Sequence, residues 1–105
     1  AYSVSLAIHQ ITKKIPQEER FELASQMRRC SKSICANLAE GFAKQRFSAV
    51  EFKRFIAIAI GSAAEMQVWV QYSIDLQYID APAASELRKD YSSISQMLMK
   101  LHANI

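Results

Sequence analysis

The segment Glu19–Gly41 constrains the fold most, because it predicts one long helix with two unlike faces. At about 100° per residue, apolar and small side chains fall on one stripe of this helix. The opposite face carries Arg28, Arg29 and Lys32 within about a quarter turn. One face is therefore expected in a core and the other in solvent. The core stripe comprises Leu23, Ala24, Met27, Ser31, Ile34 and Leu38, and extends to Phe42.

The composition also favours helices. Of the 105 residues, 50% are hydrophobic, and only two are glycine and two are proline. Ordinary usage of these two residues is about 7% and 5%. A chain of this length typically forms one domain. We therefore predict a single all-α domain over residues 1–105.

Helix boundaries can be read from caps and prolines. Residues 2–14 carry a narrow apolar stripe, and Pro16 ends this first helix because the residue before proline avoids helical geometry. The second helix is expected to begin near residues 17–19, with Gly41 as its C-terminal stop.

Two more helices follow the short connection 42–47. Ser48 and Glu51 predict a capping box for a helix that runs to about Gln77. Asp80 and Pro82 open the last helix, since proline is tolerated in a first turn. Its core positions are Leu87, Tyr91, Ile94, Leu98 and Leu101. Four helices with short links predict an antiparallel up-down-up-down four-helix bundle.

The third predicted helix has more apolar surface than one core needs. One stripe contains Phe52, Phe55, Ile56, Ala59, Ala63, Met66, Val70 and Ile74. A second stripe is predicted as a homo-oligomer interface, because large apolar patches usually mark contact sites. It comprises Ile58, Gly61, Glu65, Val68, Trp69, Tyr72 and Leu76. The alternative is that neighbouring helices cover this stripe.

Glu65 needs a partner in that second stripe, because a lone buried carboxylate is costly. Arg28 or Arg29 is the expected donor, and the alternative is that Glu65 reaches solvent. The small residues 61–64 would allow another helix to approach closely.

Positive charge is concentrated in the first half of the chain. Residues 1–54 hold ten Lys or Arg and five acids, net +5, whereas residues 55–105 hold three and five, net −2. Seven basic residues are candidate phosphate contacts in RNA or DNA. They are Arg28, Arg29, Lys32, Lys44, Arg46, Lys53 and Arg54. An ordinary solvated face is the alternative, and no motif indicates sequence-specific readout.

Motifs for catalysis or metal binding are missing from the sequence. His9 and His102 stand alone, and no metal-binding, nucleophile or phosphate-loop pattern occurs. Arg29 beside Cys30 could lower the pKa of the thiol, but a packing role is the alternative. Cys30 and Cys35 cannot bridge on one helix, which favours a reduced, cytoplasmic compartment. We expect no enzyme activity, cofactor, metal, signal peptide or membrane span.

A combination of short motifs resembles one bacterial family. The matching pieces are Pro16 with Glu19, 25–29, 33–34, 37–41, Glu51 and Phe52 with Phe55, and 59–62 with Glu65. These residues are similar to the four-helix-bundle proteins encoded in intervening sequences of large-subunit ribosomal RNA genes. The accessory variability determinant of diversity-generating retroelements is related to them. Many members have proline at Cys35, so a family-style kink in the second helix is in doubt here.

The resemblance implies an antiparallel bundle, often assembled as a homopentamer, without known enzymatic activity. The retroelement relative binds nucleic acid and partners a reverse transcriptase, while many members have no assigned function. We therefore predict a non-enzymatic, oligomeric nucleic-acid-binding protein. A protein–protein adaptor, for example an accessory subunit of a reverse transcriptase, is the alternative.

Overall fold

The structure, a computed structural model, describes residues 1–15 and 20–105. Its elements are α1 (Tyr2–Thr12), one π-helical turn η1 (Arg20–Ala24), α3 (Ser25–Lys44), α4 (Ala49–Asp75) and α5 (Ala81–Ala103). Within the described residues every regular element is helical. This confirms the all-α fold class predicted from the sequence.

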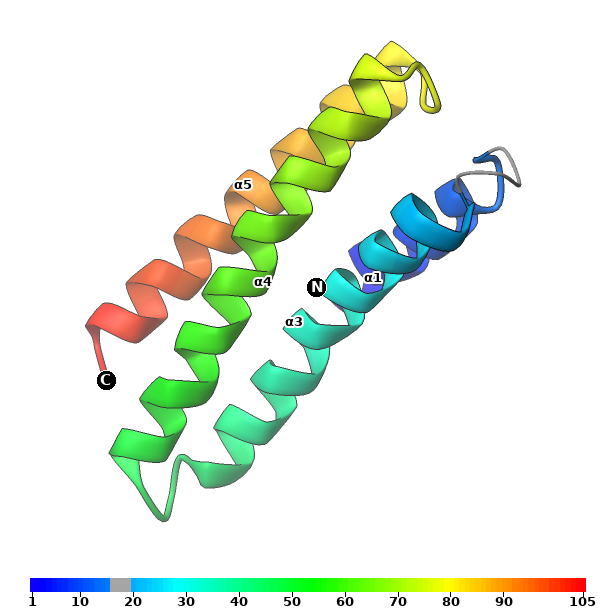
Figure 1. The fold of residues 1–105 in the computed structure, drawn as a ribbon. Coiled ribbons are helices and arrows are strands. Elements are labelled where there is room, and N and C mark those ends of the chain that lie inside the picture. Colours follow the sequence, from blue (N-terminus) through cyan, green and yellow to red (C-terminus); the bar gives the residue numbers. More distant parts are fainter. Residues whose placement is uncertain (16–19) are drawn as a thin grey trace.

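The helices form an elongated antiparallel bundle of 45 × 23 × 19 Å. In Figure 1, α3 and α4 form a hairpin, α5 returns beside α4, and α1 lies along the part of α3 that is nearest its start. Contacts between Thr12 and Arg28, and between Ser5 and Ser31, fix this antiparallel register of α1 on α3. The predicted up-down-up-down topology is confirmed.

All four long helices contribute to one core, as the predicted stripes require. The largest fully buried side chains include Ile8, Met27, Ile34, Ile56, Met66, Tyr91 and Leu98. Burial of each large apolar side chain stabilises the fold by about 1.5–3 kcal/mol. The predicted stripe residue Phe42 lies at the core's edge, with its ring centroid 5.2 Å from that of Phe52.

Both predicted N-terminal cap residues accept the expected bond, but the Ser48–Glu51 capping box is only half formed, because the Ser48 amide donates to Lys44 O and the Glu51 carboxylate pairs with Arg54. The Ser48 hydroxyl accepts a hydrogen bond from the Glu51 amide at 3.1 Å, and the Asp80 carboxylate accepts one from the Ala83 amide at 2.9 Å. These bonds satisfy amides that have no partner within the helix. Pro82 lies in the first turn of α5, as expected.

The predicted stop at Gly41 is wrong, because α3 continues to Lys44. Gly41 is buried against α4 instead. A Cβ atom placed there would lie 3.3 Å from Phe55 Cβ and 3.3 Å from Ile56 Cδ1. The glycine therefore permits close approach of two helices. α3 also runs without interruption through Cys35, where a family-style kink was in doubt.

Other helix ends differ from prediction by a few residues. α1 ends at Thr12, and Lys14 lies in a turn closed onto Ile11. α4 ends at Asp75, because Gln77 adopts a left-handed backbone with φ 60°. The expected terminator Pro16, and the expected second-helix start at 17–19, lie outside the described residues.

Candidate interaction surfaces

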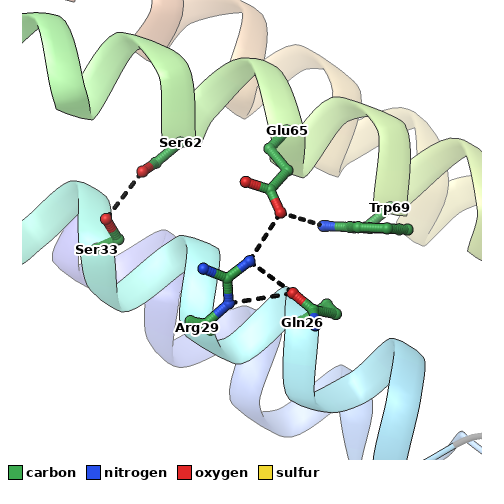
Figure 2. A network of polar contacts seen from close by, with 6 residues as sticks. All are labelled: Gln26, Arg29, Ser33, Ser62, Glu65 and Trp69. Carbon is green, nitrogen blue, oxygen red and sulfur yellow. Dashed lines mark hydrogen bonds and ion pairs between the residues drawn. The ribbon is translucent and has the colours of Figure 1, made fainter.

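A polar network joins α3 to α4 near the middle of the hairpin (Figure 2). Arg29 Nη2 lies 2.9 Å from Glu65 Oε1, which confirms Arg29 as a partner of Glu65. The same carboxylate oxygen accepts a hydrogen bond from Trp69 Nε1 at 3.2 Å. Arg29 also donates through Nε and Nη2 to Gln26 Oε1 at 3.1 and 2.6 Å. Arg29 thus bonds to Glu65 on the neighbouring helix α4 and to Gln26 on its own helix α3.

The two adjacent arginines have different partners. Arg28 Nε donates to Thr12 Oγ1 at 2.7 Å, so it joins α3 to α1. Of the two donors proposed for Glu65, the structure therefore selects Arg29. The Arg29 and Glu65 side chains remain 62% and 40% exposed. Solvent at this exposure screens the pair, and such pairs contribute at most about 1 kcal/mol.

Beside this network, Cys30 is buried in the core. Burial raises the pKa of its thiol to about 11, and the nearby Glu65 carboxylate raises it further than Arg29 lowers it. The thiol is therefore protonated at neutral pH. The packing role for Cys30 is confirmed, and a pKa lowered by Arg29 is wrong. Cys35 is half-buried, and both cysteines are free thiols.

The second apolar stripe of α4 is left open by the other helices of the chain. We call Ile58, Gly61, Val68, Tyr72 and Leu76 the α4 outer face. Its four large side chains are 40–53% exposed. Glu65 and the half-buried Trp69 border it, and the Trp69 and Tyr72 ring centroids are 5.8 Å apart. The neighbouring helices of one chain, which were the alternative to an oligomer interface, therefore do not fully cover this stripe.

The small-residue run 61–64 does not act as one unit. Gly61 is exposed, and a Cβ placed there would meet nothing within 4 Å. Ala63 is buried in the core, whereas Ser62 and Ser33 share a hydrogen bond of 2.8 Å between α4 and α3. Within this chain, close helix approach occurs at Gly41 rather than at Gly61.

The seven candidate phosphate contacts fall into two groups. Arg28, Arg29 and Lys32 lie on the first part of α3, whereas the other four surround the α3–α4 turn. Lys32 and Lys44 are twelve residues apart, which is about 18 Å along a helix. The seven residues predicted from the sequence therefore form two separate surfaces on one chain.

The group at the turn is the more available of the two. Arg54 Nε lies 2.9 Å from Glu51 Oε2, and its guanidinium carbon is 4.7 Å from the centre of the Phe55 ring. Lys44, Arg46 and Lys53 are exposed, and in the described part of the chain they have no ion-pair partner. We call these three residues the turn cations.

Phe47 is a feature of the turn that the sequence analysis missed. It is 83% exposed, directly after Arg46 and before the Ser48 cap. Its position between a helix end and a cap was the available signal, because such a residue has no helix face to bury. An exposed aromatic ring among cations is a feature of surfaces that bind single-stranded nucleic acid.

A groove of about 580 Å³ lies between α1 and α3. We call it the α1–α3 groove. Its lining is Tyr2, Ser5, Leu6, His9, Lys32, Cys35 and Ala36. The pKa of His9 is lowered by desolvation and by the positive charges of Arg28, Lys13 and Lys32. Sequence reasoning did not find the groove, because it depends on the register of α1 against α3.

No cluster of potential metal ligands occurs among residues 1–15 and 20–105. Over the same part of the chain, none of the helices has the length and apolar character needed to cross a bilayer.

The profile of the 23S rRNA-intervening sequence protein family matches residues 1–100. The chain belongs to this family. A comparison with curated proteins finds no match. Among solved structures, this intervening-sequence family member is similar to a protein with unknown function from the S23 ribosomal protein family of Bacteroides thetaiotaomicron.

That structure has a TM-score of 0.86 at 24% sequence identity, and the alignment covers 97% of this chain and 90% of the other. The likeness supports the four-helix fold of the intervening-sequence family, and it assigns no ligand.

Proposed function

We propose that this protein is a non-enzymatic, self-associating helical bundle of the cytoplasm that binds RNA or DNA without sequence preference. The observation that carries the proposal is the cluster at the α3–α4 turn. Three exposed cations, Lys44, Arg46 and Lys53, lie at or next to this turn, which also carries the exposed Phe47. Cations release counterions from phosphates, and an aromatic ring stacks on any base.

The non-enzymatic part of the proposal is supported by the state of the candidate reactive groups. The Cys30 thiol is protonated, since burial raises its pKa to about 11. The carboxylates of Glu51 and Glu65 are occupied by Arg54 and Arg29. The Arg29–Glu65 pair joins α3 to α4, whereas the Arg54–Glu51 pair lies within α4.

Self-association would multiply the basic surface. The exposed α4 outer face supports a contact between copies, because apolar patches on a protein surface mark contact sites. A homopentamer, favoured by resemblance to the family, would carry 5 × (+3) = +15. Several turns on one particle would bind one strand multivalently, which raises avidity without new contacts.

Salt dependence of binding tests the proposal. We expect affinity for single-stranded RNA to fall steeply between low and moderate salt. Replacing Lys44, Arg46 and Lys53 with alanine should reduce the log–log salt slope by about 0.7 per lost phosphate contact. The control replaces Lys89 and Lys100 on α5 with alanine, which removes two exposed charges away from the turn and should leave the slope unchanged. Binding that is insensitive to salt would contradict the proposal.

A protein–protein adaptor is the second candidate. It is favoured by the exposed apolar α4 outer face, which fits a protein partner as well as a second copy. A reverse transcriptase is the partner class suggested by the resemblance. If a protein is recovered from cell extracts after nuclease treatment, and this recovery is lost in Tyr72→Asp, the adaptor replaces nucleic-acid binding as the primary role.

A further inference from the structure

The α1–α3 groove presents two aromatic rings on one helix. Tyr2 and His9 are seven residues apart, so they share a face of α1 two turns apart, with Leu6 between them. The axial separation is about 10.5 Å. The Tyr2 ring is 72% exposed, although it lies at a groove. An exposed aromatic ring of this kind is a surface on which nucleic-acid bases stack.

α3 contributes Lys32, Cys35 and Ala36 to the lining of the groove. Cys35 and Ala36 present small side chains there, which leaves room for a flat group against the rings of α1. The groove volume of about 580 Å³ falls within the usual range of about 300–1,000 Å³ for small-ligand sites. The volume and the largely apolar lining are therefore compatible with a planar aromatic ligand.

The charge at the groove is positive. Lys32 is exposed and belongs to the lining, and none of the lining residues is acidic. The depressed pKa of His9 agrees with this, because Arg28, Lys13 and Lys32 all disfavour its protonation. A ligand that combines an aromatic ring with an anion matches both properties of the site.

The groove is also separate from the proposed self-association surface. α1 and α4 pack on different sides of α3 (Figure 1), and the α4 outer face does not include any residue of the groove. The groove therefore lies outside the α4 outer face that we propose for self-association.

We propose that the α1–α3 groove binds one unpaired base of a single-stranded nucleic acid, stacked on Tyr2 with Lys32 on the adjoining phosphate. This inference rests on the proposed nucleic-acid binding and adds a second point of contact, which requires bases that are free of a duplex. An acidic, apolar protein segment fits the charge but makes less use of the two rings.

Cys35 provides a reporter inside the groove. It is half-buried and lines the groove, whereas Cys30 is buried and its thiol pKa is raised to about 11. A maleimide at neutral pH should label Cys35 and spare Cys30 in the folded protein. Saturating single-stranded oligothymidylate should slow the labelling of Cys35 at least about tenfold, judged by mass spectrometry of the peptides.

Matched probes and variants separate the groove from the turn. A duplex and an abasic oligonucleotide of equal length should bind through phosphates but leave Cys35 labelling unchanged. Tyr2→Leu should weaken oligothymidylate binding at least about fivefold, the lower end of what loss of one stacked base produces. Tyr2→Phe keeps the ring and should bind as the parent does. Both variants should fold, because Tyr2 is largely exposed.

The outcomes distinguish the two proposals. If oligonucleotides bind but Cys35 is equally reactive with all three probes, the groove proposal is overturned and binding at the turn stands. If no oligonucleotide binds, the proposed function itself fails. If Cys35 is protected only by an acidic, apolar peptide, the groove is a protein-docking site and the base proposal is wrong.

Discussion

Arg29 on α3 is joined to Glu65 on α4 by a single Nη2–Oε1 contact of 2.9 Å (Figure 2), and Glu65 borders the exposed α4 outer face. In one chain, solvent screens this ion pair. Self-association through the same face would remove that solvent and strengthen the interaction, because the effective dielectric falls. The coupling energy between Arg29 and Glu65 should therefore increase when this surface is buried.

A double-mutant cycle of Arg29→Ala and Glu65→Gln should reveal this. At protein concentrations low enough to give monomers, we expect a coupling energy below about 1 kcal/mol in denaturant unfolding. At higher concentration the coupling should increase. The matched control is Arg54–Glu51, also 2.9 Å and similarly exposed, whose coupling should stay constant. Equal behaviour of the two pairs would argue against burial of Glu65.

Replacing glycine with alanine is expected to have opposite effects on stability at Gly41 and at Gly61. Gly41→Ala places a Cβ 3.3 Å from Phe55 Cβ, close to the α4 backbone, so the α3–α4 contact must move apart. We expect a net loss of about 1 kcal/mol, since overpacking outweighs the helix propensity of alanine. Gly61→Ala meets open space and should stabilise the monomer by about 0.5–1 kcal/mol. Thermal unfolding of both variants at low concentration measures the difference.

Sequence reasoning succeeded where a local rule determines the structure. The period of the apolar residues set the core faces of α3, α4 and α5, and the Ser48 and Asp80 caps set two helix starts. The partner of Glu65 could be narrowed to two arginines, because a carboxylate in an apolar stripe needs a cation.

Sequence reasoning failed where two different structures produce the same sequence pattern. A glycine near the end of a helical pattern can be a stop or a point of close contact, and only the position of α4 identifies Gly41 as the latter. Similarly, the register of α1 on α3 decides that Arg28 donates to Thr12 and that a groove opens beside Lys32. Such long-range pairings are not encoded in any local pattern.

Gln77 offers a stabilising substitution. Its backbone has φ 60°, a left-handed conformation that costs a residue with a side chain about 1–2 kcal/mol. Gln77→Gly should therefore raise the free energy of unfolding by about 0.5–1 kcal/mol after the entropy cost of glycine. The control is Ser85→Gly at an exposed position within α5, which should destabilise by a similar amount. A loss of stability in Gln77→Gly would contradict this account of the α4 end.

The α4 outer face predicts a variant that stays folded but fails to self-associate. Tyr72 is half-exposed in the single chain, so Tyr72→Asp should leave the helical content and the thermal midpoint of the monomer nearly unchanged. In an interface, the carboxylate would be buried without a partner, which is strongly unfavourable. Light scattering should show the mass of a monomer. Met99→Asp, on α5 and similarly exposed, is the control and should keep the parental mass.

Cys30 predicts a loss of stability at alkaline pH. Its thiol ionises near 9.0 when unfolded but only near pH 11 in the fold, because burial disfavours the thiolate. As pH rises, the unfolded chain releases the thiol proton before the folded protein does. The stability that the buried thiol contributes is therefore complete below the unfolded pKa and is lost as pH rises from about 9 to 11. Burial also raises the pKa of Tyr91 above its ordinary value of 10.0, so this residue acts in the same direction from about pH 10 upward. Urea midpoints between pH 8 and pH 11 should therefore decline. The decline should be shallower in Cys30→Ala and unchanged in Cys35→Ser, and an equal decline in all three proteins would rule out the buried thiol as its source.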